Sequence, residues 1–138
     1  MIVHSDWKHE EVFDAKTGDG KLITIDADSA HAFGPGPLQL VLMALCACTS
    51  VDVVNILKKK RQQLISLRVT AHATQAETPP RVFTRIMLTY AVGGHVSRKA
   101  VEDAVSLSKN KYCSVSKMLE KAAIVNYEII YPDGNPEP

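Results

Sequence analysis

Two stretches in the middle of the chain alternate apolar and polar residues with a period of two. This pattern is typical of half-buried β-strands, so residues 64–76 and residues 81–92 are each predicted to form a strand. Thr78-Pro79-Pro80 lies between them and predicts a turn, and the two strands should therefore form a hairpin. The apolar faces are Ile65, Leu67, Val69, Ala71 and Ala73 in the first strand, and Val82, Ile86, Leu88, Tyr90 and Val92 in the second.

The first 26 residues show the same alternation less clearly. Residues 1–13 read as one weak strand, with Val3, Trp7 and Phe13 set among polar residues. Gly18-Asp19-Gly20 is a turn signal, and residues 21–26 then read as a short returning strand. The segment is predicted to form another hairpin.

One long helix is predicted from Leu38 to about Lys60, because the apolar run is too long for a strand and contains no Gly or Pro. Pro37 suits the first turn, and the basic residues 58–61 suit the negative pole at the other end. Residues 40–48 are apolar on every side, and such a helix must be buried all round. A chain of 138 residues covers it poorly alone, so a homodimer with this helix at its centre is expected.

The remainder of the chain predicts two helices and a last strand. Gly93-Gly94 should end the second hairpin, and Ser97 can cap a helix that runs to about Lys109. A short helix near residues 114–122, a strand over residues 123–131 and a polar tail at residues 133–138 follow. The order ββ-α-ββ-αα-β predicts an α+β fold with antiparallel sheets around a long central apolar helix.

Composition and charge narrow the functional classes. A hydrophobic share of 46% with 22% charged residues is typical of a globular protein. A net charge of +1 and an aromatic share of 6% give no basis for nucleic-acid or membrane-surface binding. The first residues lack the basic start and apolar stretch of a signal peptide. With three cysteines, an odd number, the sequence is expected to be that of a cytoplasmic protein with free thiols.

The candidate chemistry lies in Cys48 and Cys113. Cys113 precedes a short predicted helix, whose N-terminus favours a thiolate, and Lys111 and Lys117 can add positive charge. Against this, a free cysteine in an apolar helix is most often a small buried hydrophobic residue, and Cys46 fits that description best. Positions two apart on a helix do not face one partner, so Cys46 and Cys48 should point different ways. Neither the cysteine spacings nor the scattered histidines predict a metal site.

At this point the chain resembles the OsmC/Ohr family of osmotically inducible and organic-hydroperoxide-resistance proteins, and within it the YhfA-like subgroup. Gly36-Pro37-Leu-Gln-Leu-Val-Leu-Met-Ala-Leu-Cys-Ala-Cys48-Thr looks like the family's proline-led helix that ends in a reactive cysteine. Lys111-Tyr-Cys113-Ser-Val-Ser-Lys looks like its second-cysteine motif. The order of elements matches over nearly the whole chain, which implies a single OsmC-like domain over residues 1–138.

The resemblance implies an intertwined homodimer and a thiol-dependent peroxidase that acts in oxidative stress defence. Cys48 would attack the hydroperoxide and become a sulfenic acid, and Cys113 would condense with it to a disulfide. An external dithiol, lipoyl-type in the better-known members, would reduce the pair, with no bound cofactor or metal. An apolar wall near Cys48, such as Leu45, would favour organic hydroperoxides.

Two positions depart from the family's pattern and leave a second function open. Peroxidase members pair the reactive cysteine with an arginine from the N-terminal hairpin, whereas here the first arginine is Arg61. Leu38 and Gln39 stand where the family has a glutamate, and Lys8, Lys16 and Lys21 are the cations of the N-terminal region. The alternative is a non-catalytic protein that binds a small apolar or thiol-reactive ligand at the dimer interface.

Overall fold

The computed structural model describes residues 1–134 and 136, and it confirms the α+β class. The chain divides into two compact units, Met1–Leu42 and Met43–Pro138, which are described separately. The prediction of a single domain over residues 1–138 is not tested by this division and stays a prediction. Of the predicted polar tail, residues 135, 137 and 138 lie outside the described residues.

The N-terminal unit holds three strands where the sequence predicted two. β1 (Val3–His9), β2 (Val12–Thr17) and β3 (Leu22–Asp26) form an antiparallel sheet in that order. The single strand predicted over residues 1–13 is wrong because Glu10 takes a left-handed φ of 46° and reverses the chain after β1. The predicted turn at residues 18–20 joins β2 to β3.

Helix α1 (Pro37–Lys59) begins at the predicted proline. The amide of Gly36 donates to Oε1 of Gln39 at 2.8 Å, so a side chain three positions along satisfies one of the free donors at the helix start. The other end closes through Arg61, whose φ of 55° lets the amides of Arg61 and Gln62 bond to the carbonyls of Lys58 and Leu57. The helix therefore has defined caps at both ends.

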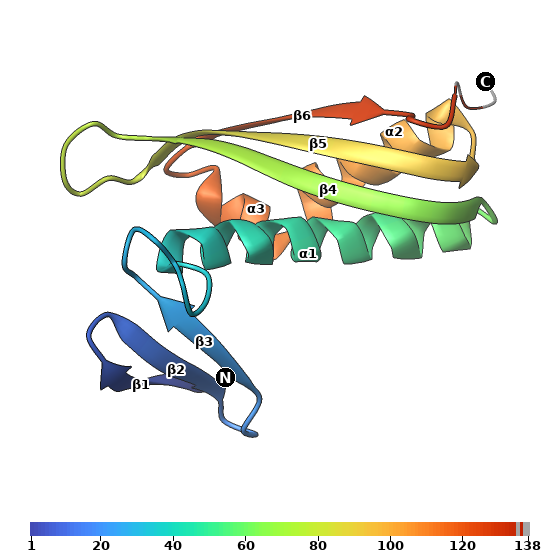
Figure 1. Ribbon diagram of the computed structural model, residues 1–138. Helices are drawn as coiled ribbons and strands as arrows, with labels where there is room; N and C mark the ends of the chain where they lie inside the picture. The colour runs from blue at the N-terminus through green and yellow to red at the C-terminus, as the bar shows by residue number, and fades with distance from the viewer. Residues whose placement is uncertain (135, 137–138) are drawn as a thin grey trace. The chain divides into compact units, whose positions relative to one another are not determined.

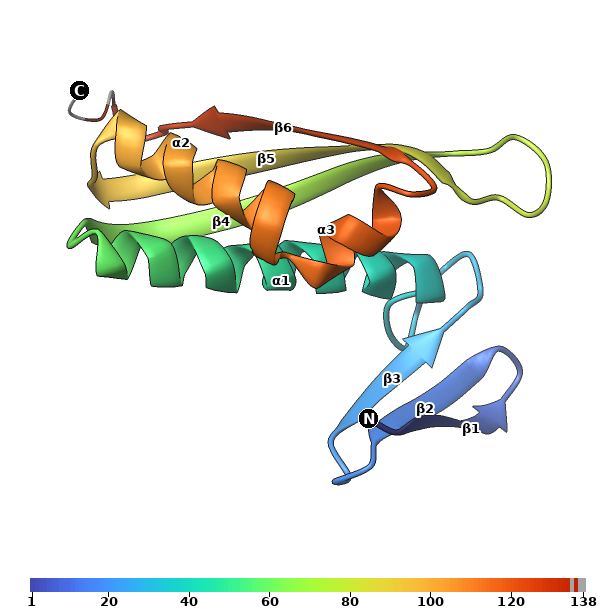
Figure 2. The same ribbon diagram turned by 180° about the vertical axis from the view of Figure 1, so that it is seen from behind.

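The C-terminal unit packs α1 from Met43 onward, two further helices and a turn against one sheet (Figures 1 and 2). β4 and β5 form the predicted hairpin, and β5 continues past Gly93 rather than ending there. Gly94, at φ 127°, pairs with Leu64 across a bulge, where a Cβ would collide with the backbone of Gln63. The elements are β4 (Gln63–Gln75), β5 (Phe83–His95), α2 (Arg98–Leu107), the π-helical turn η1 (Ser108–Tyr112), α3 (Ser114–Leu119) and β6 (Ile124–Ile130).

The last strand changes the predicted sheet. β6 pairs with β5 in parallel, so the expectation of purely antiparallel sheets is wrong for this unit. A parallel pair needs a long crossover, and α2, η1 and α3 supply it. The two bulges in the β4–β5 ladder also shift single residues between faces, so that Ile65 is 76% exposed and Val82 is exposed, while Phe83 is buried.

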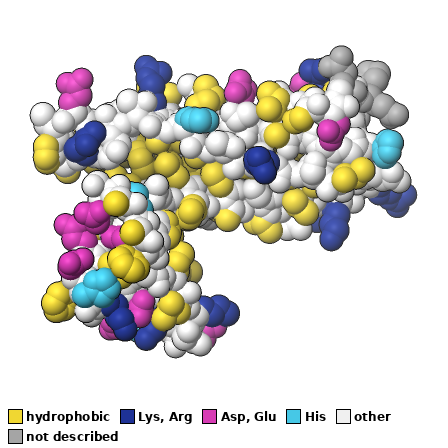
Figure 3. Space-filling view, in the orientation of Figure 1, with side chains coloured by type: hydrophobic (Ala, Val, Ile, Leu, Met, Phe, Trp, Pro, Cys, Tyr) yellow, Lys and Arg dark blue, Asp and Glu magenta, His cyan; other side chains and the backbone are white. Residues whose placement is uncertain are grey.

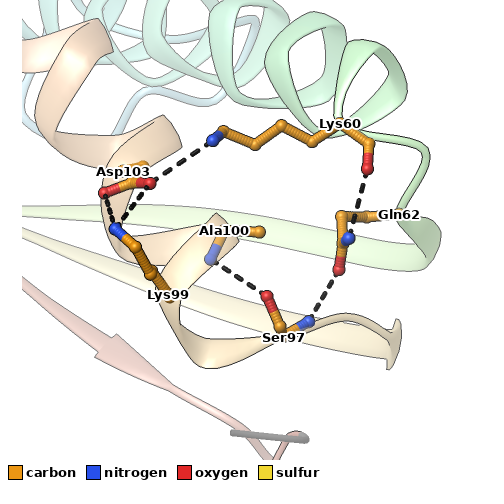
Figure 4. Close-up of polar contacts among 6 residues, drawn as sticks. All are labelled: Lys60, Gln62, Ser97, Lys99, Ala100 and Asp103. Carbon is orange, nitrogen blue, oxygen red and sulfur yellow. Dashed lines mark hydrogen bonds and ion pairs between the residues drawn. The ribbon is translucent and has the colours of Figure 1, made fainter.

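Polar contacts at the end of α1 hold the start of the crossover in place (Figure 4). The amide of Ser97 donates to Oε1 of Gln62 at 2.7 Å, and Ser97 Oγ caps α2 by accepting from the amide of Ala100 at 3.1 Å. The carboxylate of Asp103 on α2 forms ion pairs with the ammonium groups of Lys60 and Lys99, each at 3.3 Å. The predicted Ser97 cap is confirmed, and α2 is fixed against the loop that follows α1.

One side of α1 lies in the core and the other side is exposed. Leu45, Thr49, Val53 and Leu57 are buried at helical spacing, whereas Met43 and Val51 are 53% and 54% exposed. Hydrophobic side chains accordingly gather over α1 on the face of this unit drawn in Figure 3. The described residues of one chain therefore leave part of α1 uncovered, and its predicted burial by a second copy stays a prediction.

By length and composition, α1 is the one helix among the described residues that is long and apolar enough to cross a membrane. The core helix of a folded domain meets the same two criteria. Residues 43–59 of α1 contain the buried Thr49 and the half-buried Asp52, and both make side-chain hydrogen bonds with the rest of the unit.

Candidate functional site

The two predicted cysteines meet in the C-terminal unit. Cys48 is half-buried in the middle of α1, and Cys113 is fully buried at the point where η1 ends and α3 begins. Cys113 lies close enough to Cys48 for the Cys48 thiol to raise the pKa of Cys113. The structure thus brings together the two thiols that lie 65 positions apart in the sequence.

Cys113 is the protonated partner of this pair. Burial raises the pKa of Cys113 to about 12, and the neighbouring Cys48 thiol and the charge of Asp52 add to the shift. The amide of Ser116 donates to Sγ of Cys113 at 3.4 Å and opposes the shift. The prediction that the helix N-terminus would favour a thiolate at Cys113 is therefore wrong, because desolvation outweighs one amide of a short helix.

The lysines expected to assist Cys113 have other partners. Lys117 pairs with Glu120 at 2.9 Å, and the ammonium of Lys111 lies 5.3 Å from the ring centre of Tyr112. Neither is among the groups that shift the pKa of Cys113.

Cys46 faces a different neighbour. A hydrogen bond with the backbone of Ala71 on β4 lowers its pKa, but burial raises it by more. Cys46 therefore points toward the sheet and Cys48 toward Cys113, which confirms that the two do not share a partner. The position of Cys46 fits a small packing residue.

The side chains beside Cys48 are small or apolar. Ala44 and Val51, one turn to either side on the helix surface, are exposed, and so is Ala47. Leu45, expected to form an apolar wall near Cys48, has no exposed surface and belongs to the core. The apolar surface that a molecule arriving at Cys48 meets is thus formed by Ala44, Ala47 and Val51.

A network of hydrogen-bonded, buried hydroxyl groups lies next to the thiols, and the sequence pattern does not predict it. The hydroxyl of Ser108 donates to Oδ2 of Asp52 at 2.9 Å, and it lies 2.8 Å from that of Thr49. Oγ1 of Thr49 in turn lies 2.7 Å from the phenol of Tyr90. Thr49, Ser108 and Tyr90 are each at most 1% exposed. The available signal was Thr49 and Asp52, two of the few polar residues that interrupt the long apolar run of this helix.

The polar chain ends at a surface pocket. Asp52 lines a pocket of about 390 Å³ together with Ile56, Lys59, Leu107 and Tyr112. The pocket has both charged and apolar walls. It lies one turn along α1 from Cys48.

The three lysines of the N-terminal region are paired within their own unit. Lys8 contacts Asp14 at 3.4 Å and Lys16 contacts Asp6 at 3.7 Å. Lys21 pairs with Asp19 in the β2–β3 turn. Each of these lysines therefore has a carboxylate neighbour inside residues 1–42.

Metal ligands do not gather within residues 1–134 and 136. No group of three His, Cys, Asp or Glu side chains there is close enough to hold a metal ion.

Comparison with known proteins gives the family. The pattern of the family described as OsmC-like protein matches residues 27–128. The protein YhfA of Escherichia coli is 39% identical over 127 residues, which cover 90% of this chain and 94% of YhfA. A hypothetical protein from Aquifex aeolicus has a crystal structure with a TM-score of 0.82 at 32% identity, covering 96% of this chain and 97% of that one.

A more distant structure shares the fold. An organic hydroperoxide resistance protein OsmC from Legionella pneumophila has a TM-score of 0.70 at 17% identity, covering 93% of this chain and 94% of that one. With the family pattern matched over most of the chain and a curated relative similar over nearly all of it, this protein belongs to the OsmC-like family.

Proposed function

We propose that this chain is a thiol-dependent peroxidase that reduces organic hydroperoxides, with Cys48 as the peroxidatic thiol and Cys113 as the resolving thiol. The observation that carries the proposal is the contact between a half-buried and a fully buried thiol, in which Cys113 holds the proton. The partially accessible thiol is the one that a substrate can reach, and the buried thiol beside it can only react with that first thiol. Membership of a family with organic hydroperoxide resistance proteins supports it.

The proposed reaction has three balanced steps. The Cys48 thiolate attacks the terminal oxygen of ROOH, the O–O bond breaks, and Cys48 becomes a sulfenic acid while the alkoxide takes up a proton and leaves as ROH. The Cys113 thiol then displaces water from this sulfenic acid and forms the Cys48–Cys113 disulfide. An external dithiol reduces the disulfide by exchange and becomes a disulfide itself. The exposed surface formed by Ala44, Ala47 and Val51 favours a hydroperoxide with an apolar R group.

The protein is proposed to act as a cytoplasmic homodimer built from one OsmC-like domain per chain. The exposed apolar side of α1, which includes Met43 and Val51, supports a second copy as its cover, and the substrate surface beside Cys48 would then lie at the dimer interface. Light scattering at micromolar concentration should then give twice the chain mass of 15.1 kDa. A mass of one chain would contradict the dimer.

The test of the function is consumption of cumene hydroperoxide with a small dithiol, run side by side on wild type and on Cys48→Ser. Cys46→Ser is the matched control, since it removes a thiol two positions away that faces β4. Turnover in wild type and Cys46→Ser, and its loss in Cys48→Ser, is expected. An absence of turnover in wild type, with an intact Cys48 thiol by mass spectrometry, would refute the peroxidase and favour the ligand-binding alternative.

A further inference from the structure

Ser108 connects the two segments that carry the thiols. Its buried hydroxyl bonds to two residues of α1, Thr49 at 2.8 Å and Asp52 at 2.9 Å. Its backbone carbonyl accepts from the amide of Cys113 at 2.8 Å. One residue thus reaches α1, the helix of Cys48, with its side chain, and reaches Cys113 with its main chain.

The hydrogen bonds that link Tyr90, Thr49, Ser108 and Asp52 all run in one direction. A hydroxyl has a single proton to donate, and Ser108 donates its proton to the carboxylate of Asp52. The short contact with Thr49 therefore has Thr49 as the donor, and the contact between Thr49 and Tyr90 has the phenol as the donor. The order is Tyr90 to Thr49 to Ser108 to Asp52, and it depends on an acceptor at position 52.

The turn that Ser108 begins is of an uncommon type. η1 is a π-helical turn over Ser108–Tyr112, and such turns occur mostly as single insertions, often at functional sites. Its wide spacing places Cys113 one turn beyond α2 with its amide bonded to Ser108. Because the turn is short and its last residues are exposed, its contact with α1 depends strongly on the buried end at Ser108.

We propose that Asp52 and Ser108 are positioning residues for the thiol pair, because their hydrogen bond fixes η1 to α1 and holds Cys113 against Cys48. This inference rests on the proposed function for its purpose. Disulfide formation tolerates only a narrow range of separations and angles, so a fixed turn raises the effective concentration of one thiol at the other. Loss of the bond lets η1 move relative to α1, and the pair then meets less often in the bonding geometry.

The test measures this effective concentration without any hydroperoxide. Each protein, with Cys46 replaced by Ser throughout, is equilibrated in glutathione buffers, where one oxidised glutathione and the dithiol exchange to the protein disulfide and two reduced glutathiones. Ser108→Ala and Asp52→Ala should lower the effective concentration at least tenfold. Asp52→Asn should stay within threefold of wild type, since its amide oxygen still accepts from Ser108. Ser114→Ala, the same change at an exposed position next to Cys113, should have no effect.

The outcomes separate positioning from general stability and from the proposed function. If Ser108→Ala does not fold, the effective concentrations of Asp52→Ala and Asp52→Asn are compared instead. Asp52 is only half-buried, so these two variants are expected to fold. Wild-type effective concentration in a folded Asp52→Ala overturns the proposal, and so does an equal loss in Asp52→Asn and Asp52→Ala. A high effective concentration in a wild type that consumes no hydroperoxide refutes the peroxidase alone and leaves the positioning role standing.

Discussion

Replacing Thr49 by Val is expected to destabilise the protein, because valine cannot form the hydrogen bonds that Thr49 makes with the hydroxyls of Tyr90 and Ser108. The side chains are similar in size, so the change removes a buried hydroxyl and leaves little cavity. The phenol of Tyr90 then has no acceptor, which costs about 1–3 kcal/mol for a buried donor. Ser108 loses the bond it accepted, worth about 1 kcal/mol, but still donates to Asp52. The total is about 2–4 kcal/mol of unfolding free energy.

Urea unfolding at fixed protein concentration and pH 7 gives the measurement, with heat unfolding as a second reading. A loss of 2–4 kcal/mol corresponds to a fall in Tm of roughly 10 °C for a chain of this length. Thr70→Val is the matched control, because Thr70 lies on the exposed face of β4, and a change within about 0.5 kcal/mol is expected there.

The double variant Thr49→Val with Tyr90→Phe examines the cause of this loss. Removing the phenol relieves the unsatisfied donor, so the double variant should be more stable than the sum of the single effects by about 1–2 kcal/mol. Strict additivity, or a loss below about 1 kcal/mol in Thr49→Val alone, would refute the assignment of these buried hydrogen bonds.

Three further outcomes follow from other features. Arg61→Gly should stabilise the protein by about 0.5–1 kcal/mol, since glycine takes the left-handed φ of 55° without strain. Arg61→Ala should bring no gain, and calorimetric unfolding of both variants measures the difference. Leu57→Ala should cost about 2–5 kcal/mol by leaving a cavity at a residue with no exposed surface, and a smaller loss in urea unfolding would contradict its place in the core. Stability should fall with rising pH once unfolded thiols ionise near pH 9, by about 1.4 kcal/mol per pH unit for each proton that only the folded state keeps: that of Cys113 and, above pH 10, also that of Tyr90. Urea titrations from pH 8 to 11 in reductant measure this, and an unchanged onset in Cys113→Ser would count against Cys113 as its source.

The long periodic elements were predictable from the sequence, and local backbone departures were not. The β4–β5 hairpin, α1 with Pro37 in its first turn and the Ser97 cap follow from patterns that span many residues. The reversal at Glu10 and the bulge near Leu64 each depend on a single residue with an unusual φ or pairing. Such changes leave the alternation of the flanking residues intact, so the pattern gives no sign of them.

At the site, the proximity of the two thiols was predictable, whereas their electrostatics were not. The motifs around Cys48 and Cys113 pointed to a pair, and the structure places the two in contact. The protonation of Cys113 depends on complete burial, which is a property of the packed unit. Ser108 carries no sequence signal, because a serine near the end of a helix is usually exposed.

The parallel pairing of β6 with β5 makes the thiol pair depend on a long-range connection. The β4–β5 hairpin closes a short loop, whereas β6 joins the sheet through the crossover of residues 96–123. Cys48 lies on the helix just before the hairpin, and Cys113 lies in that crossover. We therefore expect local opening of β6 to loosen Cys113 relative to Cys48 while α1 and the hairpin stay folded, and native-state hydrogen exchange in β6 measures such an opening.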